Sequence, residues 1–348
     1  MKKFSNSLLS VLCLCSVLFI FACKSPSGGG STASNDICDY IRNMTKSGTA
    51  KVTGEINSDT ITAIKSALSD LRGRDNSILV ALDLSETTGL TSLPSMSTCY
   101  NLSEIYIPDS VTNIEKGVFP MGNLEKIYVA ENNQNYKSID GVLFSKDGKT
   151  LIRYPAKFVN NYEECINYVV PDSVNVIEEE AFDSCVQIKD VKISSNVTSI
   201  GRKAFARCSN LRMIDMPDSV KTIGDECFFD CVNLYNIKRL GSITELGRHT
   251  FYKCGCDVQD VDNLNETVVI PDIVTSIGER VFELSVVGTI VIPTSVTSIG
   301  SCAFSRCGYL KTIKFKGTES QWNAIQKGEG WNEFCPTDMQ IIFNYTGE

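Results

Sequence analysis

Cysteine is the residue type with the greatest capacity for chemistry in this chain, which holds fifteen cysteines but only one histidine. A thiol can act as a nucleophile, bind a metal ion or form a disulfide. A Ser–His–Asp or Cys–His arrangement would have to use the single histidine, His249. Similar segments carry Lys203 or Glu226 at the equivalent position, which is typical of an outward, solvated slot. We therefore expect no catalysis by His249.

The spacing of the cysteines favours a structural role. The chain has no C-x-x-C pair, and Cys254-Gly-Cys256 is the nearest approach to one. Several cysteines instead stand three residues before an apolar residue that opens a repeated segment, and we expect these thiols to be buried. One or two disulfides, or a metal site, are the alternatives. The cysteines at this repeated position are Cys99, Cys185, Cys208, Cys231, Cys254 and Cys307.

The composition argues against other kinds of chemistry. A net charge of -8 disfavours a nucleic-acid partner, because phosphate binding requires a basic surface. None of the 41 acidic residues falls in a recognisable motif, and neither a phosphate-binding loop nor a zinc-binding helix motif is present. We expect no enzymatic activity, no cofactor and no metal. A hydrolase with an acidic pocket is the least favoured alternative.

The first 36 residues are typical of an exported and anchored protein. Residues 1–22 contain two early lysines and then an apolar run, as in a signal peptide. The stretch IFAC, residues 20–23, resembles a bacterial lipobox, which implies that Cys23 carries a lipid. A soluble secreted protein cut near Ala22 is the alternative. The Gly- and Ser-rich residues that follow predict a lipidated, flexible tether over residues 23–36.

A repeated segment dominates residues 78–309. VTSIGRKAFARCSNL, residues 197–211, and VTSIGSCAFSRCGYL, residues 296–310, are identical at ten of their fifteen positions. The whole unit reads L-x-x-I-x-I-P-x-x-V-x-x-I-G-x-x-A-F-x-x-C-x-x, and a fixed period of this kind indicates a repeat architecture. Its phenylalanine recurs at Phe119, Phe182, Phe205, Phe228, Phe251, Phe282 and Phe304.

Each part of the unit has a physical interpretation. The alternation L-x-x-I-x-I predicts a strand with inward apolar residues, and proline ends that strand because it cannot donate to a ladder. The segment V-x-x-I-G predicts a second short extended piece, and A-F-x-x-C predicts one helical or 3₁₀ turn. One coil cannot bury its own phenylalanine, but stacked coils can. The sequence therefore predicts a mainly β solenoid of about nine coils, with parallel strands on one face and short helical turns on the other.

The repeat resembles the BspA-like leucine-rich repeat family of bacterial surface proteins over about residues 78–348. This resemblance implies a leucine-rich repeat solenoid that binds a protein ligand, with host or matrix proteins as the expected targets of adhesion. It also implies a lipid-anchored protein of the outer membrane that is exposed at the cell surface. A periplasm-facing scaffold protein is the alternative.

Caps are expected at both ends of the solenoid. Residues 37–77 predict an amino-terminal cap with one helix over residues 58–72, begun by Asp59 as N-cap and ended by Gly73. Residues 310–348 predict a carboxy-terminal cap, in which Thr318 opens a short helix through a capping box. A stack capped at both ends is expected to stay a monomer.

Two insertions interrupt the period. The first covers about residues 131–158 and predicts a β-hairpin with Asp147-Gly148 as its turn. The second covers residues 255–266, and no physical reason for it is evident in the sequence.

The outward positions of the strands form the candidate binding surface. Tyrosine and arginine favour protein interfaces, and both occur at these positions. An ordinary solvated sheet face is the alternative. The candidate contact residues are Tyr106, Tyr128, Lys192, Arg212, Asp215, Tyr235 and Lys238, and the same column passes through Val169, Val269, Val291 and Lys314.

Overall fold

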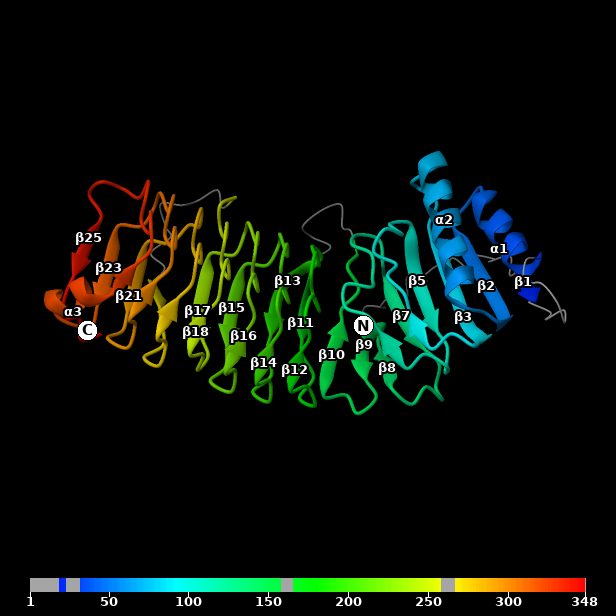
Figure 1. The fold of residues 1–348 in the computed structure, drawn as a ribbon, viewed down its shortest axis with the longest axis horizontal. Helices are drawn as coiled ribbons and strands as arrows, with labels where there is room; N and C mark the ends of the chain where they lie inside the picture. The colour runs from blue at the N-terminus through cyan, green and yellow to red at the C-terminus, as the bar shows by residue number, and fades with distance from the viewer. Residues whose placement is uncertain (1–18, 23–31, 158–164, 258–266, 348) are drawn as a thin grey trace, which may run out of the picture.

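The chain forms an elongated β solenoid. The computed structural model describes residues 19–22, 32–157, 165–257 and 267–347. Strands stand across the long axis, with two helices at one end and a short helix at the other (Figure 1). The solenoid has about 10 turns, so the predicted β solenoid of parallel strands is confirmed. Cys23 lies outside the described residues, as do residues 258–266 of the second insertion.

Parallel strands form the long face of the solenoid and are grouped in three sheets. The strand of each coil pairs with the strand of the next, so that their inward side chains lie next to one another in the core. The first sheet has the order β1-β2-β3-β5-β7, the second β11-β13-β15-β17 and the third β19-β21-β23-β25. The strands of the first sheet are β1 (Phe19–Ala22), β2 (Gly48–Glu55), β3 (Val80–Thr88), β5 (Leu102–Ile107) and β7 (Lys126–Val129). The strands of the second and third sheets are β11 (Ile166–Val169), β13 (Ile188–Lys192), β15 (Met213–Met216), β17 (Asn236–Leu240), β19 (Thr267–Val269), β21 (Thr289–Ile292), β23 (Thr312–Phe315) and β25 (Gln340–Ile342).

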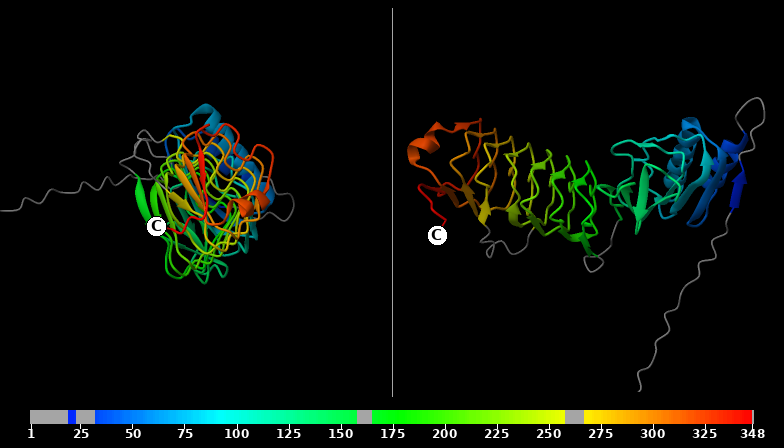
Figure 2. Two further views of the ribbon diagram at one scale, coloured as in Figure 1. Left: turned by 90° about the vertical axis from the view of Figure 1, so that its left-hand side faces the viewer. Right: turned by 90° about the horizontal axis from the view of Figure 1, so that it is seen from below.

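Two-residue strands form a second, narrower face, as the V-x-x-I-G segment predicts. Within each of three groups (β4 and β6; β12, β14 and β16; β18, β20, β22 and β24) a strand pairs in parallel with its counterpart in the next coil. Seen end-on in Figure 2, the coils of this face and of the long face lie over one another. These strands are β4 (Ser92–Leu93), β6 (Asn113–Ile114), β12 (Val176–Ile177), β14 (Ser199–Ile200), β16 (Thr222–Ile223), β18 (Glu245–Leu246), β20 (Ser276–Ile277), β22 (Ser298–Ile299) and β24 (Gln326–Lys327).

The third side of each regular coil is a run of turns, which corrects the expected helical turn. Lys203 and Arg207 have φ values of 53° and 56°, in the left-handed region that interrupts a helix. Such a conformation costs about 1–3 kcal/mol per non-glycine residue. Hydrogen bonds to the next coil offset this cost: Phe205 N–H donates to Cys227 O at 2.9 Å and Arg207 N–H to Phe229 O at 2.7 Å.

The amino-terminal region replaces these turns with helices. Helices α1 (Thr32–Arg42) and α2 (Ser58–Arg74) pack together beside strands β2 (Gly48–Glu55) and β3 (Val80–Thr88) (Figure 1). The expected cap with one helix is therefore wrong, and residues 32–36, assigned to the tether, belong to α1. The physical reason is packing, because Ile37 and Ile41 of α1 are fully buried in the same core as α2.

The ends of α2 also differ from expectation. Its N-cap is Asn57, whose side chain accepts a hydrogen bond from Thr60 N–H at 3.0 Å, and Asp59 lies within the first turn. The helix continues through Gly73 to Arg74, and the backbone N–H of Asp75 closes it by donating to Leu71 O at 2.8 Å. The predicted buried face is confirmed: Ile61, Ile64, Leu68 and Leu71 are all buried.

Strand β1 (Phe19–Ala22) pairs in parallel with β2 at the edge of the first sheet. Its residues belong to the segment expected to be removed on export. Removal would leave β2 as the edge strand, still paired with β3 on its other side.

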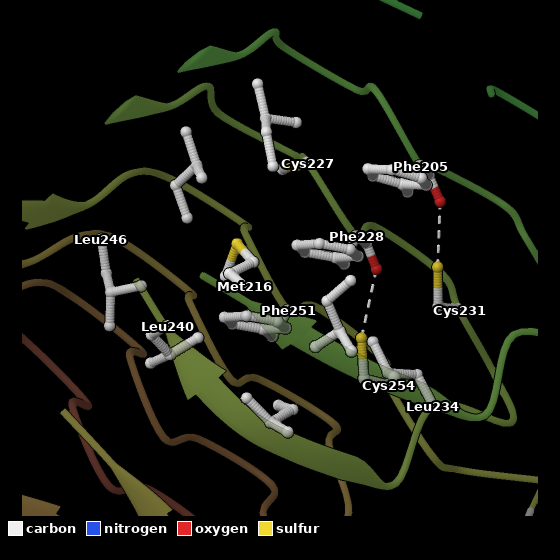
Figure 3. Packing of buried hydrophobic residues seen from close by; sticks show 14 of the residues in the cluster. Phe205, Met216, Cys227, Phe228, Cys231, Leu234, Leu240, Leu246, Phe251 and Cys254 are labelled. Atoms are coloured by element: carbon white, nitrogen blue, oxygen red, sulfur yellow. Dashed lines mark hydrogen bonds between the residues drawn. The ribbon is translucent and has the colours of Figure 1, made fainter. Parts of the chain in front are cut away.

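A column of aromatic rings fills the core of the regular coils (Figure 3). Phe205 and Phe228 stack with ring centroids 5.3 Å apart and ring planes 4° apart. Tyr154 begins the column, stacked on Phe182 at 5.3 Å, and Trp331 ends it edge-on against Phe304 at 6.1 Å. The members between these ends are Phe182, Phe205, Phe228, Phe251, Phe282 and Phe304.

The first insertion divides the core. Strands β8 (Tyr136–Ile139), β9 (Val142–Ser145) and β10 (Thr150–Arg153) form an antiparallel meander, which confirms the hairpin, and β10 then pairs in parallel with β12. Phe119, expected to belong to the repeated phenylalanines, packs in the amino-terminal core cluster instead. Tyr154, just after β10, takes the place of a phenylalanine in the column.

The carboxy-terminal cap agrees with the prediction. Helix α3 (Glu319–Ala324) begins with a capping box between Thr318 and Gln321. Trp322 of α3 is buried and packs edge-on against Phe315, at a centroid distance of 5.3 Å. Strand β25 pairs with β23 and covers the last coil.

Candidate functional site

Two stacked tyrosines form the best-defined feature of the candidate surface. Strands β5 (Leu102–Ile107) and β7 (Lys126–Val129) pair in parallel so that Tyr106 lies opposite Tyr128. The two rings stack at 4.4 Å with planes 19° apart. The Tyr106 hydroxyl donates to Glu104 Oε2 at 3.0 Å, and burial, followed by this hydrogen bond, raises the pKa of Tyr106. The pair is therefore held in one arrangement before any ligand binds.

Charged side chains extend this feature along the sheet. The strand register places Lys51 opposite Asp83 and Asp83 opposite Tyr106. Lys51 Nζ lies 2.6 Å from Glu86 Oε1 and 3.8 Å from Asp83 Oδ2, and the bond to Glu86 is the main cause of its raised pKa. We call the set of Lys51, Asp83, Glu104, Tyr106, Lys126 and Tyr128 the tyrosine patch.

Sequence reasoning missed Lys51 and Asp83, because it placed the first strand at residue 78 and examined outward positions only from the next coil onward. A signal was present in the sequence: residues 49–53 read TAKVT, in which Ala50 and Val52 are buried and Lys51 lies between them. This alternation of inward and outward residues is the pattern of a strand.

The other candidate residues lie on the second sheet, beyond the first insertion. Lys192 stands opposite the exposed Val169, and Tyr235 lies just before β17. Arg212 lies just before β15, and its carbonyl accepts a hydrogen bond from Tyr235 N–H at 3.3 Å. Because β7 and β11 belong to different sheets, the candidates form two groups and not one continuous strip.

The structure differs from the predicted column at two positions: Lys238 is exposed as expected but does not lie opposite Asp215, and Val291 does not face outward. A register shift between β15 and β17 places Arg239 opposite Asp215, where Lys238 was expected. Arg239 Nε lies 2.5 Å from Asp215 Oδ1, so this ion pair occupies the column. Val291, expected to face outward, is only 2% exposed.

The repeated cysteines form a ladder of thiol hydrogen bonds. Cys231 Sγ donates to Phe205 O at 3.0 Å and Cys254 Sγ to Phe228 O at 3.1 Å (Figure 3). The same bond recurs in other coils, and Ser285 takes the thiol's place in one of them by donating to Phe251 O. The further thiol donors are Cys208, Cys307 and Cys335, which donate to Phe182 O, Phe282 O and Phe304 O respectively.

This ladder assigns the cysteines a structural role. All twelve cysteines within the described ranges are free, which contradicts the disulfide alternative there. Burial raises the pKa of Cys185 to about 12, so its thiol stays protonated at neutral pH. In the same ranges no group of three or more His, Cys, Asp or Glu side chains is placed to hold a metal ion.

His249 is less exposed than expected. Its ring packs edge-on against Tyr252 at 5.2 Å and Phe229 at 6.2 Å, and its backbone has a φ of 54°. Burial is the main cause of the lowered pKa of His249. The imidazole thus serves as a half-buried packing element on the outer side of a turn.

Comparisons with known proteins agree with the repeat. A family model described as "BspA type Leucine rich repeat region" matches in six copies, over residues 75–166, 156–265 and 260–327. No curated protein matches the chain. Among the helices in the described part of the chain, none has the length and apolar character needed to cross a bilayer.

Several solved structures are also similar. A leucine-rich repeat protein from Eubacterium ventriosum is 25% identical, with a TM-score of 0.62 over 75% of this chain and 68% of that chain. A leucine-rich cell surface protein from Faecalibacterium prausnitzii is 28% identical, with a TM-score of 0.45 over 72% of this chain and 66% of that one. The pneumococcal vaccine antigen PcpA is 20% identical, with a TM-score of 0.46 over 78% of this chain and 61% of that one.

Proposed function

The chain belongs to the BspA-type leucine-rich repeat family, and on this premise we propose that it is a protein-binding protein of the bacterial cell surface. A lipid on Cys23 holds it in the outer membrane, and the solenoid projects outward as a monomer. Its ligand is a protein, with host or matrix proteins as the expected targets of adhesion. The cell surface protein from Faecalibacterium prausnitzii named above is consistent with this location.

The stacked pair of Tyr106 and Tyr128 is the observation that carries this proposal. Both rings are half-buried on an otherwise charged sheet face, and the stack together with the bond to Glu104 fixes them in advance. A side chain that is already ordered loses little conformational entropy on binding. Tyrosine also offers an apolar ring and a polar hydroxyl to a protein partner.

A binding experiment tests the patch. The full mature chain is immobilised and exposed to a panel of purified extracellular-matrix proteins, and binding is measured by surface plasmon resonance. Replacing both Tyr106 and Tyr128 with Ala should reduce binding to the captured ligand at least tenfold, because interface tyrosines often contribute 2 kcal/mol or more. Tyr309→Ala removes an exposed tyrosine from another coil and serves as the matched control.

Unchanged binding by the double variant would show that the tyrosine patch is not the surface that binds the ligand. A loss of equal size in Tyr309→Ala would show a general effect of surface tyrosines. The thermal melt of each variant checks that the solenoid still folds.

Protease treatment of intact cells tests the location. A surface protein is digested while the envelope is intact, whereas a periplasm-facing scaffold is protected until the envelope is broken. Cys23→Ala should abolish incorporation of labelled fatty acid and release the chain from membranes. Digestion only after lysis would favour the scaffold.

A further inference from the structure

A cavity of about 270 Å³ lies where the first insertion interrupts the stack of turns. One wall is the segment of residues 114–121, and the opposite wall is the turn of residues 178–183. The meander β8–β9–β10 supplies the rest of its lining, including Ile152 and Arg153. The cavity shares no residue with the tyrosine patch, so it is a separate feature of the molecule.

The cavity exists because one turn is missing. In regular coils, backbone N–H groups of each turn donate to the next turn, as Arg207 N–H does to Phe229 O. At the insertion Tyr154 N–H still donates to Ala181 O at 2.7 Å. The next acceptor, Asp183 O, receives its hydrogen bond from a side chain instead: Arg153 Nη2 donates to it at 3.1 Å. The guanidinium thus replaces a backbone donor, and the space of the missing turn stays open.

Arg153 carries an unmet hydrogen bond in this space. The residue is only 6% exposed, and its Nη1 and Nη2 groups donate to Glu180 O and Asp183 O. Its Nε–H has no hydrogen-bond partner among the residues that the structure describes. A buried donor without a partner is unfavourable, so a ligand acceptor brought against this guanidinium would recover a hydrogen bond.

The charge of the lining favours a cationic group on the same ligand. Five carboxylates line the cavity but only two cationic side chains do. Most of the buried or half-buried carboxylates are paired: Glu179 lies 3.1 Å from Lys116 Nζ and 3.3 Å from an Arg202 nitrogen, and Asp183 pairs with Arg207. The lining residues with charge are Glu115, Lys116, Arg153, Glu178, Glu179, Glu180 and Asp183.

Glu180 is the carboxylate best placed for that group. It is half-buried, and no ion pair is formed by it within the described residues. Its Oε2 atom lies 2.9 Å from the position that a Cβ on Gly117 would take, so the carboxylate reaches from one wall to the other. Ile114, Phe119 and Met121 add an apolar surface beside it.

We propose that this cavity binds the amino-terminal residue of a peptide with an apolar side chain. The ammonium group lies against the Glu180 carboxylate, the first carbonyl oxygen accepts from Arg153 Nε–H, and the side chain packs on Phe119 and Ile152. Pockets for drug-sized ligands measure about 300–1,000 Å³, so about 270 Å³ suits one or two amino-acid residues.

Isothermal titration calorimetry of the full chain with the tripeptide Leu-Gly-Gly tests the proposal. Wild-type protein should bind the free tripeptide, and N-acetyl-Leu-Gly-Gly, which lacks the ammonium group, should bind at least tenfold more weakly. Glu180→Gln should weaken binding of the free tripeptide by a similar factor, because a hydrogen bond between charged groups is typically worth that much.

Glu226→Gln is the matched control, because Glu226 occupies the equivalent turn position two coils away with the same φ of 58°. It should leave binding of Leu-Gly-Gly unchanged. The proposal is overturned if wild-type protein does not bind Leu-Gly-Gly, if acetylation has no effect, or if the two glutamine variants bind equally well. Loss of matrix-protein binding in the tyrosine variants would not affect these results.

Discussion

The amino-terminal region, residues 32–129, and the regular coils, residues 165–347, differ in the side chains that fill their cores. In the regular coils the phenylalanine rings are fully buried and stack along the core. In the amino-terminal region aliphatic side chains fill most of the core, and Tyr106 and Tyr128 stack on the outer face. Two helices cover the first region, whereas turns cover the second. The aliphatic core of the amino-terminal region leaves Tyr106 and Tyr128 half-buried on the outer face, where they are available to a ligand.

Replacing one ring of the column should have the largest effect on stability. Phe205→Ala removes a fully buried ring that stacks on both neighbours, and it should lower the free energy of unfolding by about 3–5 kcal/mol. Phe119→Ala, outside the column and beside the cavity, should cost less. Urea unfolding followed by circular dichroism measures both. Equal losses would show that the column adds nothing beyond ordinary burial.

A cysteine of the ladder should show an intermediate effect. Cys231→Ala leaves the Phe205 carbonyl without its thiol donor, so we expect a loss of about 1–3 kcal/mol. Cys231→Ser should cost less, because Ser285 already makes the equivalent bond to Phe251 O. The same urea experiment compares the two variants. If serine is the worse replacement, burial of the thiol matters more than its hydrogen bond.

The helical cover of the amino-terminal region should respond to loss of its cap, with a smaller effect. Asn57→Ala removes the acceptor for Thr60 N–H and should cost about 1 kcal/mol. Asp59→Ala, within the first turn, should lower the free energy of unfolding by only about 0.3 kcal/mol, because Asp59 contributes only its charge near the helix N-terminus. Thermal unfolding of the two variants ranks them, and a larger loss for Asp59→Ala would restore the cap that the sequence alone suggested.

The period of the repeat carried most of the information about the fold. It located the strands, the phenylalanine column and the cysteine position, because those residues recur with fixed chemistry. Tyr154 escaped notice because the residues around it, RYPAK, lack the A-F-x-x-C pattern. Helix α1 escaped notice because its first residues are small and polar, and the helix is stabilised by burial of Ile37 and Ile41 against α2.

The candidate sites were predictable only where register is simple. Tyr106 and Tyr128 occupy equivalent positions of adjacent strands, so counting along the chain was enough to pair them. Lys238 is exposed as predicted, but a register shift between β15 and β17 places Arg239 opposite Asp215, and a repeat count cannot reveal such a shift. The cavity depends on a missing turn and on the side chain of Arg153, which only three-dimensional packing brings together.

The thiol ladder has a consequence for how the protein matures. Cys208, Cys231, Cys254 and Cys307 of the ladder are buried, and each thiol already donates to a carbonyl oxygen, so oxidants that act on exposed sulfur cannot reach these four residues. Folding of these coils should therefore proceed without an oxidoreductase and be indifferent to reducing agents. At the surface location proposed above, the fold itself would keep these buried thiols in their reduced form.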